Sequence, residues 1–400
     1  MEEQRQLAET EEKAAQAPDP DHPSKPDSPT DIKPPAWGYV FKRSVAEFSK
    51  DQCTDLAAAL TYFAVLSLFP GLLAVISLLG VFGQGQATTD WILDFLAEHA
   101  PGELVTLLSE PISQLADRGG SGLALVTGLV GALWAASGYV GAFGRAMNRI
   151  YEIVEGRPFW KLRPMNLLVT VIVVGCIVTV LGAFLLAGDV GRELDAGLAS
   201  VMGWASWPLA AALGVLMIAV LYYFTPNVRQ PKFRWISLGA VIALLGMVLA
   251  AAGFAFYVAN FSRYNAMYGT IGSVIVLLLG LWIMNNLLLF GAEFDAEVER
   301  GRQLQAGIEA EETIQLPPRD TRQIDKRQEK SDGLVDQGRE LRETHAEPDA
   351  DAPPPDAEAS GSEAGEEGEG PRHWYADPEV RAGLGMDGAT PAPPRATPPN

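Results

Sequence analysis

The chain has 400 residues, of which 48% are hydrophobic, and a net charge of -19. Residues 1–36 and 303–400 together carry -17 of that charge, so residues 37–302 are close to neutral. Acidic segments repel phosphates, which argues against nucleic acid as a partner. Segments rich in charge and poor in aromatics bury too little apolar surface to offset the entropy of ordering. We therefore expect 1–36 and 303–400 to be largely disordered, although the charged stretch from Arg319 to Arg342 could form a solvated helix.

The middle of the chain contains long apolar stretches without Lys or Arg at their centres. A bilayer core about 30 Å thick needs roughly 20 apolar helical residues, and backbone polar groups in lipid must be satisfied internally. The sequence therefore predicts an all-α integral membrane protein with a bundle of six transmembrane helices and disordered acidic termini. The six expected spans are Leu56–Phe82, Gly122–Phe143, Asn166–Leu186, Trp204–Phe224, Trp235–Val258 and Thr270–Phe294.

The loops of this six-span domain, residues 37–302, differ in basic residues. Five lie between Arg145 and Arg163, in the loop between spans two and three, whereas the three loops on the opposite side hold one each, namely Arg118, Arg192 and Arg263. Loops rich in Lys and Arg stay in the cytoplasm. We expect a multi-pass protein of the bacterial cytoplasmic (inner) membrane with both termini in the cytoplasm.

The segment 88–118, between spans one and two, is long and acidic. Asp90, Asp94 and Glu98 recur every four residues with apolar residues between them. This spacing favours short amphipathic helices at the outer surface, and a structured loop is the alternative.

The first candidates for a substrate path or gate lie in span one and at the end of span two. Tyr62 and Pro70 lie within span one, and a proline there removes a backbone hydrogen bond and can kink the helix. Asn148 and Tyr151 follow span two beside two arginines. They could meet an anionic lipid or substrate, or simply set topology and anchor the interface.

The later candidates are Asn227 after span four, Tyr268 before span six, and Asn286 and Glu293 within span six. At 100° per residue, Trp282, Asn286 and Glu293 fall within about 40° of one another. Ionisable groups in membrane helices usually face the bundle interior or water. This stripe fits a substrate path or a coupling site, whereas an interfacial Glu293 would be ordinary.

No enzyme constellation is apparent in the sequence. Of the four histidines, His22, His345 and His373 lie in the terminal regions and His99 stands alone. A histidine-based metal site or catalytic triad needs several such groups together. We expect no catalytic residue, no metal site and no cofactor, and therefore not an enzyme.

Several short motifs within 37–302 resemble the YihY/BrkB family of bacterial inner-membrane proteins. They are Ala57–Tyr62, Leu66–Pro70, Trp134–Ser137, Ala146–Tyr151, Tyr222–Val228, Tyr264–Gly269 and Gly291–Glu293. The resemblance implies six membrane spans and an envelope or transport role. Some members carry a ribonuclease label that is thought mistaken, and others are linked to serum resistance, virulence or export of lipid-type envelope molecules. The chain departs from relatives at Trp282–Asn286, where an aromatic with small polar residues is common.

Three classes of function remain open at this point. The leading hypothesis is a transporter or exporter of lipid or envelope molecules, with membrane lipids as partners and an anionic lipid or envelope molecule as substrate. The second is a non-transporting scaffold whose tails recruit partners. The remote third is a ribonuclease, which would need clustered carboxylates or histidines and a basic surface. Neither the substrate nor the oligomeric state follows from the sequence.

Overall fold

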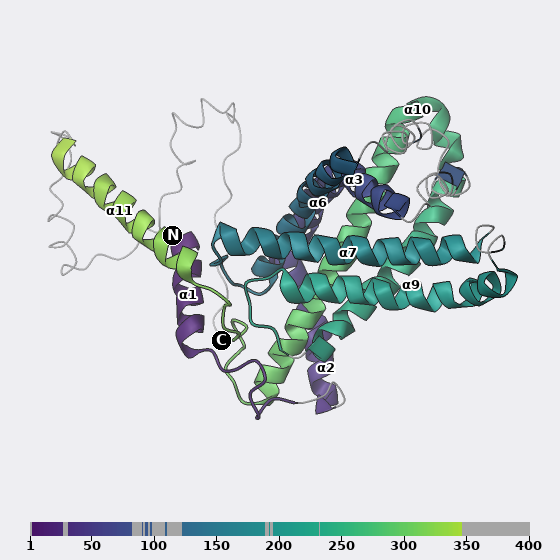
Figure 1. Cartoon of the computed structure of the whole chain (residues 1–400). Coiled ribbons are helices and arrows are strands. Elements are labelled where there is room, and N and C mark those ends of the chain that lie inside the picture. The colour runs from purple at the N-terminus through teal and green to yellow at the C-terminus, as the bar shows by residue number, and fades with distance from the viewer. Residues whose placement is uncertain are drawn as a thin grey trace, which may run out of the picture. The chain divides into compact units, whose positions relative to one another are not determined.

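The computed structural model of the chain describes residues 2–26, 31–81, 122–188, 195–231 and 233–345, with a few isolated positions between 90 and 109 and Arg192. Within these residues the regular structure is α-helical, which confirms the predicted class, and one isolated bridge pairs Val228 with Pro318. The longer helices are α1 (Glu2–Gln16), α2 (Pro34–Lys50), α3 (Cys53–Val81), α6 (Gly122–Ile150), α7 (Phe159–Ala187), α9 (Ala196–Phe224), α10 (Phe233–Gln305) and α11 (Arg322–His345) (Figure 1).

Four helical segments of the described chain are long and apolar enough to cross a membrane. They correspond to predicted spans three to six, and they are Phe159–Ala187, Ala199–Phe224, Leu238–Tyr257 and Val274–Gln305. Helices α3 and α6 coincide with the first two predicted spans, and each has 29 residues, or about 43 Å of helix. Large apolar side chains such as Trp204 and Leu249 are exposed on these helices, which suits contact with lipid.

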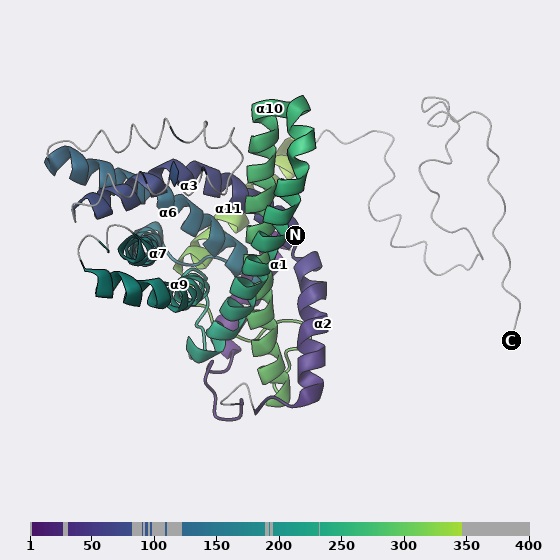
Figure 2. The ribbon, with the colours of Figure 1, turned by 90° about the vertical axis from the view of Figure 1, so that its right-hand side faces the viewer.

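Helix α10 doubles back, so that its two halves pack against each other along their length (Figure 2). A Cβ at Gly239 would lie 2.2 Å from the Gly291 carbonyl oxygen, and one at Gly291 would lie 2.6 Å from the Gly239 carbonyl oxygen. Further along, Gly246 faces Leu287 and Gly280 faces Phe254. Small residues let membrane helices approach closely, and here the two glycines bring the backbones into direct contact.

One end of the bundle, which we call the basal end, is built from the loops 151–158 and 225–231 and the segment 306–321. Arg319 donates its backbone N–H to the Asn227 carbonyl at 2.9 Å, and Gln323 donates to the Gly156 carbonyl at 3.0 Å. Ile314 and Leu316 are buried in the same apolar core as Tyr222 and Phe143, whose rings stack at 6.1 Å. The basal end therefore joins segments far apart in the sequence into one core.

The prediction of disorder is wrong for parts of both terminal regions. Helix α1 buries Leu7 and Thr10, and the Thr10 Oγ1 accepts the backbone N–H of Val154 at 3.2 Å. Residues 306–321 pack on the basal end. From Arg322 onward the chain forms the exposed helix α11, in agreement with the solvated helix that the stretch from Arg319 to Arg342 suggested. A few apolar residues anchor α1 and residues 306–321. The prediction of disorder rested on the average composition of each terminal region, which does not show such single residues. Residues 346–400 and most of 88–118 lie outside the described residues.

Candidate functional site

The second half of α10 carries a polar cluster where it meets α3 and α6. Asn285 is 4% exposed. The Tyr139 hydroxyl of α6 donates to its Oδ1 at 2.7 Å, and its Nδ2 donates to Thr61 Oγ1 of α3 at 3.2 Å. Thr61 in turn donates to the Ala57 carbonyl. This amide therefore links three of the expected membrane helices through hydrogen bonds.

Two turns further along α10, the Glu293 carboxylate is buried against the start of α3. It is 1% exposed, and the Cys53 thiol donates to its Oε1 at 3.3 Å. Among the residues that the structure describes, no Lys or Arg forms an ion pair with it. The Trp282 indole also reaches α3, donating to the Thr54 carbonyl at 3.1 Å. An unpaired carboxylate inside a membrane bundle is costly, so its burial calls for an explanation beyond packing.

A network of ion pairs around Glu152 lies at the basal end. Glu152 forms ion pairs with Lys13 at 3.7 Å, Lys50 at 3.8 Å and Arg300 at 3.7 Å. Burial, together with the Glu152 and Glu47 carboxylates, raises the pKa of Asp51 to about 6. This network connects helices α1, α2 and α10 around the buried carboxylates.

Asn148 and Asn227 meet at the basal end. The Asn227 backbone N–H donates to Asn148 Oδ1 at 2.7 Å, and the Asn148 amide donates to Glu155 at 3.0 Å. The Asn227 side chain donates to the carbonyls of Val154 and Asp320 at 3.0 and 2.9 Å. With their polar groups used in this way, the two asparagines hold three basal segments together.

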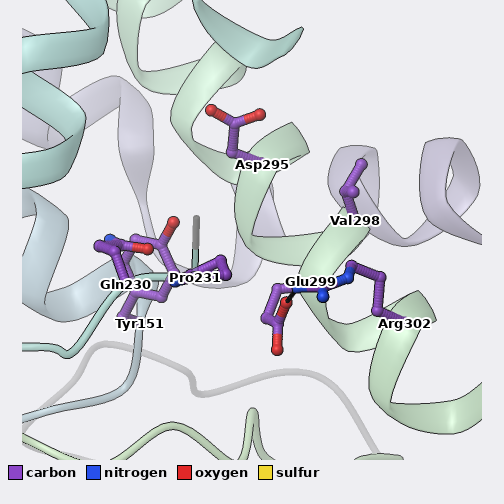
Figure 3. Close-up of a pocket in the computed structure, with 7 residues that line it drawn as sticks. All are labelled: Tyr151, Gln230, Pro231, Asp295, Val298, Glu299 and Arg302. Carbon is purple, nitrogen blue, oxygen red and sulfur yellow. Dashed lines mark hydrogen bonds and ion pairs between the residues drawn. The ribbon is translucent and has the colours of Figure 1, made fainter. Parts of the chain in front are cut away.

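Tyr151 lines a small cavity of about 10 Å³ next to these segments, enough for roughly one water. Its other lining residues are Gln230, Pro231, Asp295, Val298, Glu299 and Arg302 (Figure 3). Asp295 Oδ1 accepts the Gly239 N–H at 2.7 Å, whereas Asp295 Oδ2 and Gln230 Oε1 are buried without a hydrogen-bond partner. Two acceptor oxygens without donors make a single water the natural occupant.

The other candidates lie apart from this site. Tyr62 is 62% exposed on α3, with its ring edge against Phe63, and α3 continues as a helix through Pro70. Asn286 donates to the Trp282 carbonyl of its own helix. The Tyr268 side chain lies outside the described residues. Sequence reasoning missed the part played by Asn285 and Tyr139, and the visible signal was the polar pair at 285–286.

Comparisons with known proteins agree with this membrane architecture. The sequence family described as "Virulence factor BrkB" matches residues 44–314. The chain belongs to the BrkB family. Its match includes α3 to α10 and residues 306–314 of the basal end, and leaves out α1 and α11.

Several curated proteins resemble this BrkB-family chain. The "Putative ribonuclease-like protein YfkH" of Bacillus subtilis is 30% identical over 274 residues, which cover 66% of this chain and 96% of that protein. The UPF0761 membrane proteins of Alkalilimnicola ehrlichii and Nitrosospira multiformis are 28% and 26% identical, over 64% and 66% of this chain. The matched segments span only 56% and 61% of those two proteins. No solved structure matches the chain.

Proposed function

We propose that this BrkB-family protein is a six-span transporter of the bacterial cytoplasmic membrane that moves a lipid or envelope molecule. The basal end, with both termini, then lies in the cytoplasm. The observation that carries the proposal is the Glu293 carboxylate, which is buried at the contact of α10 and α3 with a thiol as its donor. Ionisable groups inside membrane bundles mark substrate paths and coupling sites.

The polar cluster around Asn285 supports the same role. It lies between α3, α6 and α10, two helical turns from Glu293, and both Asn285 and Glu293 form hydrogen bonds with α3. Hydrogen bonds between membrane helices are modest in strength, about 0.6 kcal/mol on average. Such bonds can therefore exchange partners as a substrate passes.

The test is lipid translocation by the purified protein in liposomes, read as the accessibility of a fluorescent lipid to a membrane-impermeant quencher. Glu293→Gln keeps the size of the side chain and its ability to accept from Cys53. We expect translocation by wild type and its loss in Glu293→Gln, with Asn286→Leu as the matched control because the hydrogen bond that Asn286 makes among the described residues stays within α10. A fully active Glu293→Gln variant would remove Glu293 from the path.

A membrane scaffold is the second candidate, and the surface of α11 favours it. Leu334, Val335 and Leu341 are exposed on this polar helix, and exposed apolar side chains can receive a partner. A chain truncated after Thr321 retains residues 306–321 of the basal end. If that chain translocates lipid like wild type, transport does not need the tail; if only the truncation abolishes function in cells, the scaffold is favoured.

The ribonuclease label carried by one relative has no support from the groups that the structure describes. Within those residues, no three His, Cys, Asp or Glu side chains are placed to hold a metal ion. The proposed non-enzymatic role predicts that purified protein leaves RNA intact. Degradation that co-purifies with the protein and vanishes in Glu293→Gln would restore the enzymatic reading.

A further inference from the structure

A strip of small residues on α6 is flanked by two arginines near the basal end. Ser137, Gly141 and Arg145 follow one another at intervals of four, so they share one face of the helix. Helix α7 meets this face, where Arg163 Nη1 donates to Ser137 Oγ at 3.4 Å. A Cβ at Gly141 would lie 3.1 Å from Asn166 Nδ2 and 4.0 Å from Arg145 Nη1. Hydrogen-bond donors from two helices therefore gather around Gly141, and we call these residues, Ser137, Gly141, Arg145, Arg163 and Asn166, the Gly141 site.

The two arginines of the Gly141 site carry charge that no carboxylate neutralises within the described chain. Arg145 donates to the Gly141 carbonyl and lies 5.4 Å from the centre of the Phe63 ring. Arg163 lies 4.9 Å from the Trp134 ring and 5.7 Å from the Phe159 ring. By contrast, other basic groups of the basal end are ion-paired, among them Lys25, Arg157, Lys161, Arg300 and Arg302.

Asn166 adds an independent observation at the same place. The residue is only 4% exposed, and its side-chain amide makes no hydrogen bond within the described chain, since the bond to Thr170 uses its backbone carbonyl. Its amide atoms still reach the surface of the chain, and an amide without a partner gains from a hydrogen bond to a ligand. Its Nδ2 lies beside Gly141, as does Arg145 Nη1, so an acceptor bound there would satisfy it.

We propose that the Gly141 site binds the phosphate of an anionic membrane phospholipid. The guanidinium groups of Arg145 and Arg163 and the amide of Asn166 are its donors. Planar guanidinium groups suit phosphate oxygens, because they donate two parallel hydrogen bonds. Basic pockets between membrane helices on the cytoplasmic side are suited to anionic headgroups.

The position of the Gly141 site along α6 and α7, together with two exposed tryptophans nearby, favours a lipid over a soluble phosphate. Arg145 lies five residues before the end of α6, and Arg163 lies four residues after the start of α7, so both are about 6–8 Å from the helix ends. In the topology proposed above, this position lies in the headgroup region of the cytoplasmic leaflet. Trp134 is 47% exposed and Trp160 is 82% exposed, and tryptophans of this kind sit at membrane interfaces, beside acyl chains.

Binding at the Gly141 site is a property separate from transport. Its role as the entry point for a lipid substrate rests on the proposed function, whereas the binding itself does not. Selective lipid binding by a protein that fails to translocate lipid would support the Gly141 site and contradict the transporter. Normal translocation by an Arg145→Gln/Arg163→Gln double variant would mean that the Gly141 site is not on the substrate path.

The experiment is native mass spectrometry of the purified full-length protein in detergent, titrated with phosphatidylglycerol or phosphatidylcholine. We expect tighter binding of phosphatidylglycerol by wild type. Arg145→Gln and Arg163→Gln each weaken it about fivefold, the loss expected for one basic group at a lipid headgroup. The matched control is Arg149→Gln, an exposed arginine one turn further along α6 that donates to Gln52 instead.

Two further variants separate lost charge from lost structure. Arg163→Lys keeps the charge and is expected to retain most of the selectivity, whereas Asn166→Asp places a carboxylate beside the phosphate and is expected to abolish it. Equal affinity of wild type for the two lipids would overturn the proposal. So would an Arg149→Gln loss as large as that of Arg145→Gln, or binding of glycerol phosphate as tight as that of the lipid.

Discussion

The side-chain amide of Asn285 lies between the hydroxyl groups of Tyr139 and Thr61, accepting at 2.7 Å from the first and donating at 3.2 Å to the second. The three residues come from α6, α10 and α3, which the chain separates by more than 70 residues at each step. An amide has directional partners on two sides, so these two hydrogen bonds restrict how the three helices rotate against one another.

Asn285→Leu is expected to destabilise the protein more than Asn286→Leu. The first substitution leaves the Tyr139 hydroxyl without its acceptor, whereas the second removes only a bond within α10. Hydrogen bonds of this kind between membrane helices contribute about 0.6–1.7 kcal/mol. The measurement is thermal unfolding in detergent, followed by tryptophan fluorescence. Equal midpoints for the two variants would contradict the interhelical role of Asn285.

Gly239→Ala is expected to disrupt the hairpin formed by the two halves of α10. The new methyl group would lie 2.2 Å from the Gly291 carbonyl oxygen, and overpacking of this kind costs about 1–3 kcal/mol. Gly253→Ala, in the same helix with no atom within 4 Å of its Cβ, is the control and gains up to about 1 kcal/mol of helix propensity. A stable Gly239→Ala variant would mean that the halves are not in contact there.

Asp51 predicts a specific pH dependence of stability. Its pKa is raised to about 6 by burial and by the Glu152 and Glu47 carboxylates, whereas in the unfolded chain it is close to 3.9. The folded state therefore binds more protons between these values, so Asp51 lowers the unfolding free energy as pH rises from about 4 to about 6. Above pH 6 the decrease in unfolding free energy caused by Asp51 is constant, at about 1–3 kcal/mol.

Asp51→Asn is accordingly expected to raise the unfolding temperature at pH 7.5 and to leave it unchanged at pH 4. Asp55→Asn, which alters an exposed carboxylate one turn away, serves as the control and should do neither. Unfolding of both variants and wild type across pH 4 to 8 makes the comparison. If the advantage of Asp51→Asn over wild type does not grow between pH 4 and 6, the pKa of Asp51 is not raised in the folded protein.

Part of the candidate site followed from the sequence. Projection at 100° per residue placed Trp282 and Glu293 on one face of α10, and both reach the start of α3, through Thr54 and Cys53. The same projection favoured Asn286 over Asn285. It could not foresee that α6 approaches α10 on a second side, because helix neighbours are a property of the whole fold. Leu7, Ile314 and Leu316 are buried and anchor short parts of the acidic terminal regions. The average composition of those regions predicts disorder and does not identify them.

The last prediction concerns the order of the N-terminal segment, which a buried ion pair ties to α10. Lys25 Nζ lies 2.8 Å from Glu299 Oε1, and both side chains are almost fully buried. It also donates to the Pro20 carbonyl at 3.3 Å. Removing one partner of such a pair leaves a buried charge uncompensated and costs about 3–5 kcal/mol. Because Arg302 also pairs with Glu299, we expect the lower end of that range for Lys25→Met.

The structural consequence is release of residues 1–32 before the helices themselves unfold. Limited proteolysis should therefore cut Lys25→Met within this segment at protease concentrations that spare wild type. Arg5→Met is the control, since the Arg5–Glu9 pair is solvent-exposed and such pairs contribute at most about 1 kcal/mol. Equal cleavage of the wild type and Lys25→Met would mean that the N-terminal segment does not depend on this ion pair for its attachment to the basal end.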